Sequence, residues 1–131
     1  MNRAEQRLHI ACVSFLRQAA PDLAFFHPAN GGYRTPREAA LFKALGVRAG
    51  VPDLCLILAP EGRAAFIEFK SAQGRPSAAQ TEFAGLCDRS GALWAVARSL
   101  GDLEAILLRW EVPLRARAKS TRVVARTAYR H

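Results

Sequence analysis

The sequence predicts one α/β domain in which a central mixed β-sheet is flanked by helices. The chain has 131 residues, close to the usual size of a single domain (roughly 100–150 residues), and 50% of them are apolar, which is enough to build a core. Segments with helical periodicity alternate with short apolar runs typical of strands, in the order α, β, α, β, β, α, β, α. Because two strand patterns follow each other directly, the sheet should combine a hairpin with crossover connections.

The first half of the chain predicts a long helix, a short strand and a short helix. Residues 3–19 carry apolar side chains at helical spacing, and Pro21 ends the pattern. AFFH at 24–27 is typical of a short strand. Residues 37–45 form a second helical segment that Gly46 should terminate.

The second half predicts a hairpin, a helix, a strand and a last helix. The apolar runs before and after residues 59–63 are joined by a hairpin-length loop that contains glycine. Ser77 and Gln80 form an S-x-x-Q capping box, which predicts that a helix begins there. The five expected elements occupy residues 53–58, 64–70, 77–91, 92–97 and 100–110.

The charge balance favours a polyanionic partner such as nucleic acid. Nineteen Lys and Arg against eleven Asp and Glu give a formal net charge of +8. Much of the excess lies in a C-terminal segment without acids, residues 115–131, which is either a solvated terminus or an arm that neutralises phosphates. Its six cations are Arg115, Arg117, Lys119, Arg122, Arg126 and Arg130.

The cysteines and the N-terminus predict a soluble, cytoplasmic protein. Cys12, Cys55 and Cys87 are far apart and lack metal-finger spacing, so we interpret them as reduced core residues. The first ten residues lack the apolar core of a signal peptide, and no apolar run approaches the ~20 residues that span a bilayer.

Two charged residues interrupt an apolar strand pattern. Glu68 and Lys70 in FIEFKS share one face of the expected strand, because side chains alternate between faces. A buried charge without a partner is costly, so these residues need an ion, a partner or a chemical role. The alternative is a half-exposed strand with an ordinary Glu/Lys pair.

The neighbouring strand begins with Asp53, and its register decides which face this carboxylate takes. If residues 59–63 form a five-residue loop, Leu58 pairs with Ala64, and Asp53 then lies opposite Phe69 and faces away from the Glu68 side. A one-residue change or a bulge would bring the two carboxylates together. Converging Asp53 and Glu68 would form an oxygen site for a divalent cation such as Mg²⁺.

Glu5 lies on the apolar stripe of the first expected helix. It is either a first-turn acid favoured by the helix dipole or an inward-facing acid that meets a cation. Gln80 is similarly open, because a capping box explains it without catalysis.

The ordered motifs resemble the PD-(D/E)xK nuclease superfamily and, within it, the VRR-NUC family. The resemblance covers Glu5 to about Gly91 and rests on HPANGGYR, EAALFKALGVRAGVPDL and FIEFKSAQGRPSAAQ in that order. It implies a restriction-endonuclease-like core. We expect a nuclease domain at 1–114 and a basic tail at 115–131, which lies outside the resemblance and is inferred from charge only.

The resemblance also implies roles for individual residues. Asp53, Glu68 and the Phe69 carbonyl match the ligands of Mg²⁺ or Mn²⁺, and Lys70 matches the catalytic lysine. Glu5 resembles the family's N-terminal acid beside the metal, and Gln80 resembles a polar residue that faces the site.

The implied activity is that of a metal-dependent, structure-selective DNA endonuclease. Small single-domain relatives from bacteria or phages act as homodimers on branched DNA, such as four-way (Holliday) junctions, and larger relatives process flaps. The alternatives to an endonuclease are a binding module without catalysis, an exonuclease or a nickase. We expect phosphate contacts from loop arginines and from the tail. The expected DNA-binding residues are Arg34, Arg37, Arg48, Arg75, Arg115, Arg117 and Lys119.

Overall fold

The computed structural model describes residues 1–29 and 34–118, and it confirms the predicted α/β class and element order. Its helices and strands alternate as the sequence pattern indicates, and the differences lie at element boundaries. In chain order the elements are α1 (Arg3–Ala19), β1 (Ala24–Phe26), α2 (Pro36–Ala44), β2 (Leu54–Leu58), β3 (Arg63–Phe69), α3 (Ala78–Ser90), β4 (Leu93–Ala97) and α4 (Leu100–Arg109).

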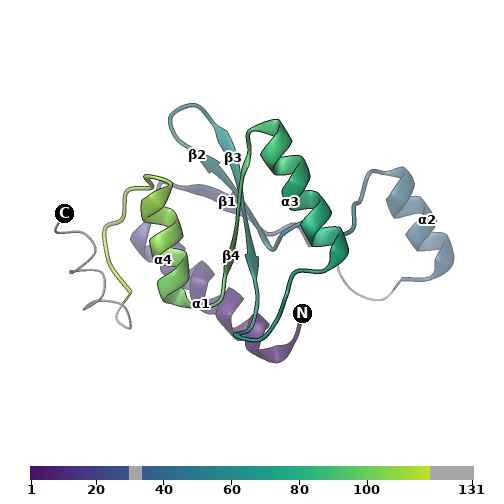
Figure 1. Cartoon of the computed structure of the whole chain (residues 1–131), viewed down its shortest axis with the longest axis horizontal. Coiled ribbons are helices and arrows are strands. Elements are labelled where there is room, and N and C mark those ends of the chain that lie inside the picture. Colours follow the sequence, from purple (N-terminus) through teal and green to yellow (C-terminus); the bar gives the residue numbers. More distant parts are fainter. Residues whose placement is uncertain (30–33, 119–131) are drawn as a thin grey trace.

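The four strands form one mixed sheet in the order β1-β2-β3-β4. β1 with β2 and β2 with β3 are antiparallel, whereas β3 and β4 are parallel and are connected through α3. In Figure 1, α1 and α4 lie on one side of the sheet and α3 lies on the other. The sheet is therefore covered on both faces, as an α/β fold requires.

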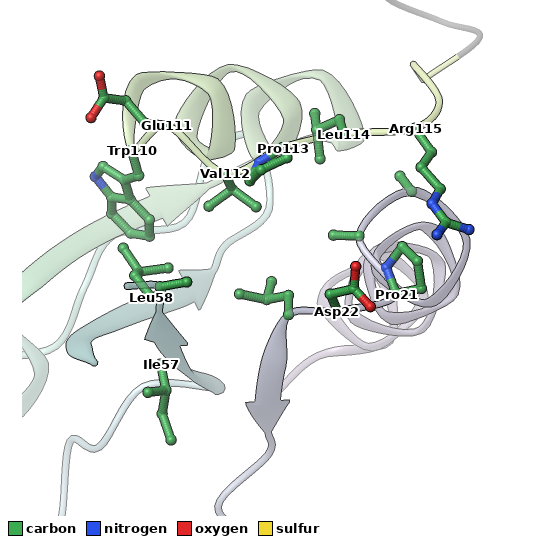
Figure 2. Close-up of a pocket in the computed structure, with 14 residues that line it drawn as sticks. Pro21, Asp22, Ile57, Leu58, Trp110, Glu111, Val112, Pro113, Leu114 and Arg115 are labelled. Carbon is green, nitrogen blue, oxygen red and sulfur yellow. The ribbon is translucent and has the colours of Figure 1, made fainter. Parts of the chain in front are cut away.

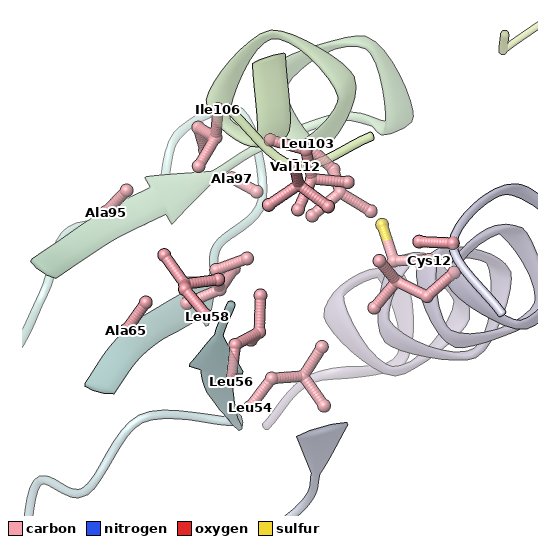
Figure 3. Packing of buried hydrophobic residues seen from close by; sticks show 14 of the residues in the cluster. Cys12, Leu54, Leu56, Leu58, Ala65, Ala95, Ala97, Leu103, Ile106 and Val112 are labelled. Carbon is pink, nitrogen blue, oxygen red and sulfur yellow. The ribbon is translucent and has the colours of Figure 1, made fainter. Parts of the chain in front are cut away.

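The main core lies between the sheet and the α1/α4 layer. Alternate strand residues such as Leu56 and Ala65 point toward the side of Cys12 on α1 and Leu103 on α4, and all four are fully buried (Figure 3). The other face of β3 carries Phe66, whose ring meets Phe83 of α3 edge-on at 5.1 Å. Because side chains alternate along β3, Glu68 belongs to this second face.

The register of the β2–β3 hairpin differs by one residue from the predicted one. Leu58 pairs with Arg63, so β3 begins one residue earlier than expected and the expected pairing of Leu58 with Ala64 is wrong. Gly62 makes this register accessible, because it adopts a positive φ of 78° and its N–H donates to the Leu58 carbonyl at 2.8 Å. The connection is thereby closed within residues 59–62.

Helix α2 projects away from the sheet (Figure 1). None of its residues is buried, and its N-terminus is held by a capping box in which Thr35 and Glu38 hydrogen-bond each other's backbone. In the described part of the chain, no helix is both long and apolar enough to cross a membrane.

Candidate metal and catalytic site

The corrected register brings Asp53 and Glu68 to the same face of the sheet. Leu54 pairs with Ile67, so the next position outward sets Asp53 opposite Glu68. Asp53 is fixed there because its Oδ2 accepts a hydrogen bond from the Phe69 N–H at 2.8 Å. The expectation that Asp53 lies opposite Phe69 is therefore wrong, and the one-residue alternative holds.

Glu68 is a buried acid whose two oxygens have different surroundings. Oε2 accepts a hydrogen bond from Gln80 Nε2 at 2.8 Å and lies 3.7 Å from Lys70 Nζ. Oε1 is buried and has no hydrogen-bond partner among the described residues. Such an orphaned carboxylate oxygen is costly unless a proton or a cation meets it.

Burial raises the pKa of Glu68 to about 8, and the negative charge of Asp53 acts in the same direction. The Lys70 ammonium opposes this rise, but it does not offset the cost of desolvation. In the absence of a cation, the Glu68 carboxyl is thus largely protonated at neutral pH. A bound divalent cation would favour the ionised form instead.

Gln80 has both of the roles that the sequence left open. Its Oε1 accepts from the Ser77 N–H at 2.8 Å, which completes the capping box of α3. Its Nε2 simultaneously donates to Glu68 Oε2. The start of α3 is therefore tied to the acid on β3 through one side chain.

Glu5 reaches the same end of the sheet from α1. It is 7% exposed, and its Oε2 accepts from the Ser71 N–H at 3.2 Å and from Asn2 Nδ2 at 3.1 Å. A Cβ at Gly74 would lie 3.2 Å from that oxygen, so the small residue leaves room for the carboxylate. Glu5 therefore faces inward, toward the loop that follows Lys70.

A tight backbone contact positions the loop before β2 against α3. Gly50 has a positive φ of 79°, and a Cβ there would clash with the carbonyl carbon and oxygen of Ala79. It would also approach the Gln80 nitrogen at 2.8 Å. Glycine at position 50 thus allows the Pro52-Asp53 segment to pack on the helix that carries Gln80.

Sequence reasoning missed Arg98 and His9. Arg98 follows β4, and one guanidinium nitrogen donates to the carbonyls of Ser71 and Gly74 at 2.8 and 2.5 Å, which orders the loop beside Glu5. Its only sequence signal is a cation directly after a strand. His9 lies one helical turn after Glu5 on α1, and burial lowers its pKa.

The predicted DNA-binding arginines outside the C-terminal segment lie around α2, in the loop before β2 and in the loop after β3. Arg34 lies over the Phe42 ring at 4.2 Å, and Arg48 is 3.8 Å from Glu82 in an exposed ion pair. Arg37 is exposed on α2, and Arg75 is exposed in the loop after β3.

The C-terminal segment lies at the other end of α1. The Arg115 N–H donates to the Ala19 carbonyl, about 21 Å along the helix axis from Glu5 at 1.5 Å per residue. Arg117 follows in the same segment, and Ala118 is buried with its N–H bonded to Glu104 Oε2 at 2.6 Å. The expected phosphate-binding residue Lys119 lies outside the described residues, as do Tyr33, Arg122, Arg126 and Arg130.

An apolar pocket of about 250 Å³ lies near this end of the molecule (Figure 2). Leu58, Trp110 and Val112 line it, together with Pro21 at the end of α1. Leu58 ends β2, whereas Asp53 precedes its first residue. The pocket is therefore separate from the acidic cluster and contains none of the predicted catalytic residues.

The acidic cluster fits a hard divalent cation. Asp53 and Glu68 supply carboxylates on one face, and the Phe69 peptide is held beside them. The buried Glu68 Oε1, which has no hydrogen-bond partner among the described residues, is an oxygen that a proton or a cation can meet. Mg²⁺ and Mn²⁺ prefer such oxygen ligands.

A mixed sheet that brings an aspartate and a Glu-x-Lys step together at one end, with helices on both faces, is the architecture of the PD-(D/E)xK nucleases. The model of the VRR-NUC domain family matches residues 33–100, which is more than half of the chain. This protein therefore belongs to the VRR-NUC family, and by that membership it is a nuclease-family protein that binds DNA.

A solved structure named "VRR_NUC domain protein" has the same fold. It matches with a TM-score of 0.63 and 20% sequence identity, over 86% of this chain and 93% of the other. No curated protein matches this sequence.

Proposed function

We propose that this protein is a Mg²⁺- or Mn²⁺-dependent endonuclease that hydrolyses phosphodiester bonds in branched DNA, such as four-way junctions or flaps. The observation that carries the proposal is the convergence of Asp53 with Glu68, whose buried Oε1 has no partner among the described residues, beside Lys70. A fold that only bound DNA would gain nothing from this costly arrangement.

The proposed ligands are the carboxylates of Asp53 and Glu68 and the carbonyl of Phe69, with Glu5 as a nearby acid. When bound, the cation polarises the phosphodiester and makes water a better nucleophile. Gln80 supports this role because its hydrogen bond to Oε2 orients the Glu68 carboxylate and leaves Oε1 for the cation.

Lys70 is the proposed catalytic cation. Its ammonium is largely buried and lies 3.7 Å from Glu68 Oε2, so it is held where the ligands are. A fixed positive charge in such a partly desolvated site stabilises the negative charge that develops on the phosphate during attack. Lys70 could equally orient the attacking water, and both roles need the same position.

Arginines in two loops are the proposed phosphate contacts beside the cluster. Arg48 lies in the loop that Gly50 packs against α3, and Arg75 follows the loop that bonds Glu5. The Arg48–Glu82 ion pair is exposed, so it contributes at most about 1 kcal/mol and DNA can replace it. Arg34 and Arg37, at the base of α2, would extend this contact.

We propose a homodimer as the acting form. One chain carries one acidic cluster, so a symmetric pair is the simplest way to cut two strands of a junction. Helix α2 is a candidate contact because it buries none of its own residues and exposes Leu41 and Leu45.

The test is cleavage of plain duplex, flap, splayed-arm, four-way-junction and closed circular DNA with Mg²⁺, Mn²⁺ or chelator. We expect metal-dependent cutting that prefers a branched substrate, and paired cuts across the junction if the dimer acts. Lys70→Ala should lower the rate by about 100-fold or more, because lost charge stabilisation of a transition state costs that much.

Arg109→Ala is the control, since it removes one positive charge from an exposed position in the last turn of α4, outside the proposed DNA and dimer contacts. It should leave cutting largely intact. Cutting of linear but not circular DNA would indicate an exonuclease. Salt-sensitive binding without cutting by either metal would refute the enzyme and favour a binding module.

A further inference from the structure

We propose a second metal site, formed by His9, His27 and Asp53, that takes a borderline transition-metal ion such as Zn²⁺. One ring nitrogen of each histidine and one Asp53 carboxylate oxygen all lie within 4.8 Å of one another. The three residues come from α1, from the position after β1 and from the position before β2, so the fold brings them together. This site goes beyond the proposed function, because it is not the pair of carboxylates on β2 and β3.

The spacing is close to that of a bound ion. Ligand atoms about 2.0–2.2 Å from a tetrahedral Zn²⁺ lie roughly 3.3–3.6 Å from each other. From the 4.8 Å limit, the ligand atoms need to approach one another by only about 1 Å to reach this geometry. The residues also line one open groove beside α1, with Gln6 and Pro52, so an ion can enter from solvent.

The His27 ring is already oriented by the backbone. Its Nδ1 lies 2.6 Å from the Asp53 carbonyl oxygen, which can only accept, so Nδ1 carries the proton and donates. The lone pair is then on Nε2, where it is available to a metal. A ring N–H bonded to a carbonyl is the arrangement that orients metal-binding histidines in general.

Aromatic contacts hold the His9 ring beside His27. The two rings meet edge-on with centroids 4.7 Å apart, and the His9 ring also lies 4.9 Å from the Phe69 ring. Both imidazoles are thus restrained before any ion binds. Restraint of this kind lowers the entropy lost on binding.

The donor set selects a different class of ion from the acidic cluster. Two imidazoles and one carboxylate suit Zn²⁺ or Co²⁺, whereas Mg²⁺ prefers oxygen ligands. Three protein ligands also leave a fourth position for water or a phosphate oxygen. Asp53 is common to both sites and has two carboxylate oxygens, so it can bridge two cations.

The cysteines do not compete for the ion. Burial raises the pKa of all three thiols, that of Cys12 to about 12, and only a thiolate is a good ligand. A thiol that stays protonated at neutral pH binds Zn²⁺ weakly. Tight binding of one Zn²⁺ per chain would therefore indicate the histidine site and not a cysteine site.

The test is calorimetric titration of the full-length, metal-free protein with Zn²⁺ in excess Mg²⁺, with Co²⁺ absorption as a second probe. We expect one Zn²⁺ per chain and a tetrahedral Co²⁺ spectrum. His9→Ala and His27→Ala should each weaken Zn²⁺ binding by more than about 100-fold. Loss of a residue that only supports a ligand already lowers metal affinity by about 10–100-fold, and loss of the ligand itself should cost more. Circular dichroism checks that each variant folds. If an alanine variant does not fold, His9→Asn or His27→Gln replaces it, since each removes the imidazole but keeps a polar side chain.

Two controls separate this site from the acidic cluster. His131→Ala removes the third histidine of the sequence and should leave Zn²⁺ affinity unchanged. Glu68→Gln should abolish nuclease activity if the proposed function is right, and it should retain Zn²⁺ binding in either case. Zn²⁺ affinity that is equal in wild type and both His9 and His27 variants would overturn the inference, and so would loss of binding in His131→Ala.

Discussion

At the scale of one residue, Glu68 is a buried acid that lowers the stability of the fold. The side chain is 3% exposed, and only one of its oxygens has a hydrogen-bond partner among the described residues. Glu104 is equally buried, yet its Oε2 accepts a hydrogen bond from the Ala118 N–H. The two acids are therefore similarly buried, but they differ in how their carboxylate oxygens are hydrogen-bonded.

Glu68→Gln should stabilise the metal-free protein at alkaline pH. The folded-state pKa of about 8 lies above the ordinary 4.5, so the folded protein binds the extra proton between these values. The penalty of ionised Glu68 is absent below about pH 4.5, grows as pH rises, and is complete above about pH 8. Each pKa unit corresponds to about 1.4 kcal/mol, so the variant should gain a few kcal/mol at pH 9 and none near pH 5.

Urea unfolding across this pH range, with chelator present, measures the effect. Glu104→Gln is the matched control and should destabilise at both pH values, because it weakens an existing hydrogen bond. With saturating Mg²⁺ or Mn²⁺, wild type should become more stable than Glu68→Gln. The cation stabilises only a folded state that binds it, and the variant lacks one of the proposed ligands. A variant less stable than wild type at pH 9 without metal would contradict this account of Glu68.

At the scale of elements, the site depends on how closely the loop before β2 packs on α3. Gly50 contacts the backbone of Ala79 and Gln80, in the first turn of the helix. The same turn holds Gln80 by its capping box and aims its Nε2 at Glu68. A displacement of this turn would therefore reach the acid directly.

Gly50→Ala should cost several kcal/mol and also impair cleavage. The new Cβ would overlap backbone atoms of Ala79, so α3 or the loop must move. This cost adds to the roughly 1–3 kcal/mol of strain at positive φ. Gly46→Ala is the matched control, because Gly46 has a φ of 95° but no atom within 4 Å of a Cβ. Thermal unfolding of both variants should show the larger loss for Gly50→Ala, and equal losses would mean that the close approach has no effect.

The elements were predictable from sequence, but the register of the hairpin was not. Period-two alternation placed Glu68 and Lys70 on one face, and a capping box marked the start of α3. Both features are local. Alternation is equally compatible with a loop of four or five residues, and only the positive φ of Gly62 favours the shorter one. That glycine was the available signal.

Contacts between distant segments account for the rest of what sequence could not give. Ser71 bonds Glu5 from 66 residues away, and His27 meets Asp53 from 26 residues away. Periodicity carries no information about which helix turn faces which loop. The helical stripe left two explanations of Glu5 open, and both its inward direction and its partner on the loop after β3 needed the packed fold.

At the scale of the whole molecule, the described start of the basic C-terminal segment is packed far from the acidic cluster. Arg115 bonds the end of α1, and the chain is still packed at Ala118. The division into a domain at 1–114 and a tail at 115–131 stays a prediction. A deletion that tests the tail should begin after Ala118, so that the contact with Glu104 is kept.

Deletion of residues 119–131 should weaken DNA binding and flatten its salt dependence. The deletion removes four cations and no acid, and each lost phosphate contact lowers the slope of log K against log salt by about 0.9. Fluorescence anisotropy with a labelled junction at several salt concentrations measures the slope. A variant that keeps residues 119–131 but replaces their four cations by glutamine separates the effect of charge from that of chain length. An unchanged slope would refute the phosphate-binding role of the tail.

Helix α2 has nine residues, none of them buried, and it is held mainly by its own ends. Thr35 and Glu38 cap the start, and the Val47 N–H closes the other end on the Phe42 carbonyl. Isolated helices of this length are marginal in water, so α2 can open and re-form without disturbing the core. The protein can therefore reshape this arm around a partner at little cost in global stability, while the sheet that carries Asp53 and Glu68 stays rigid.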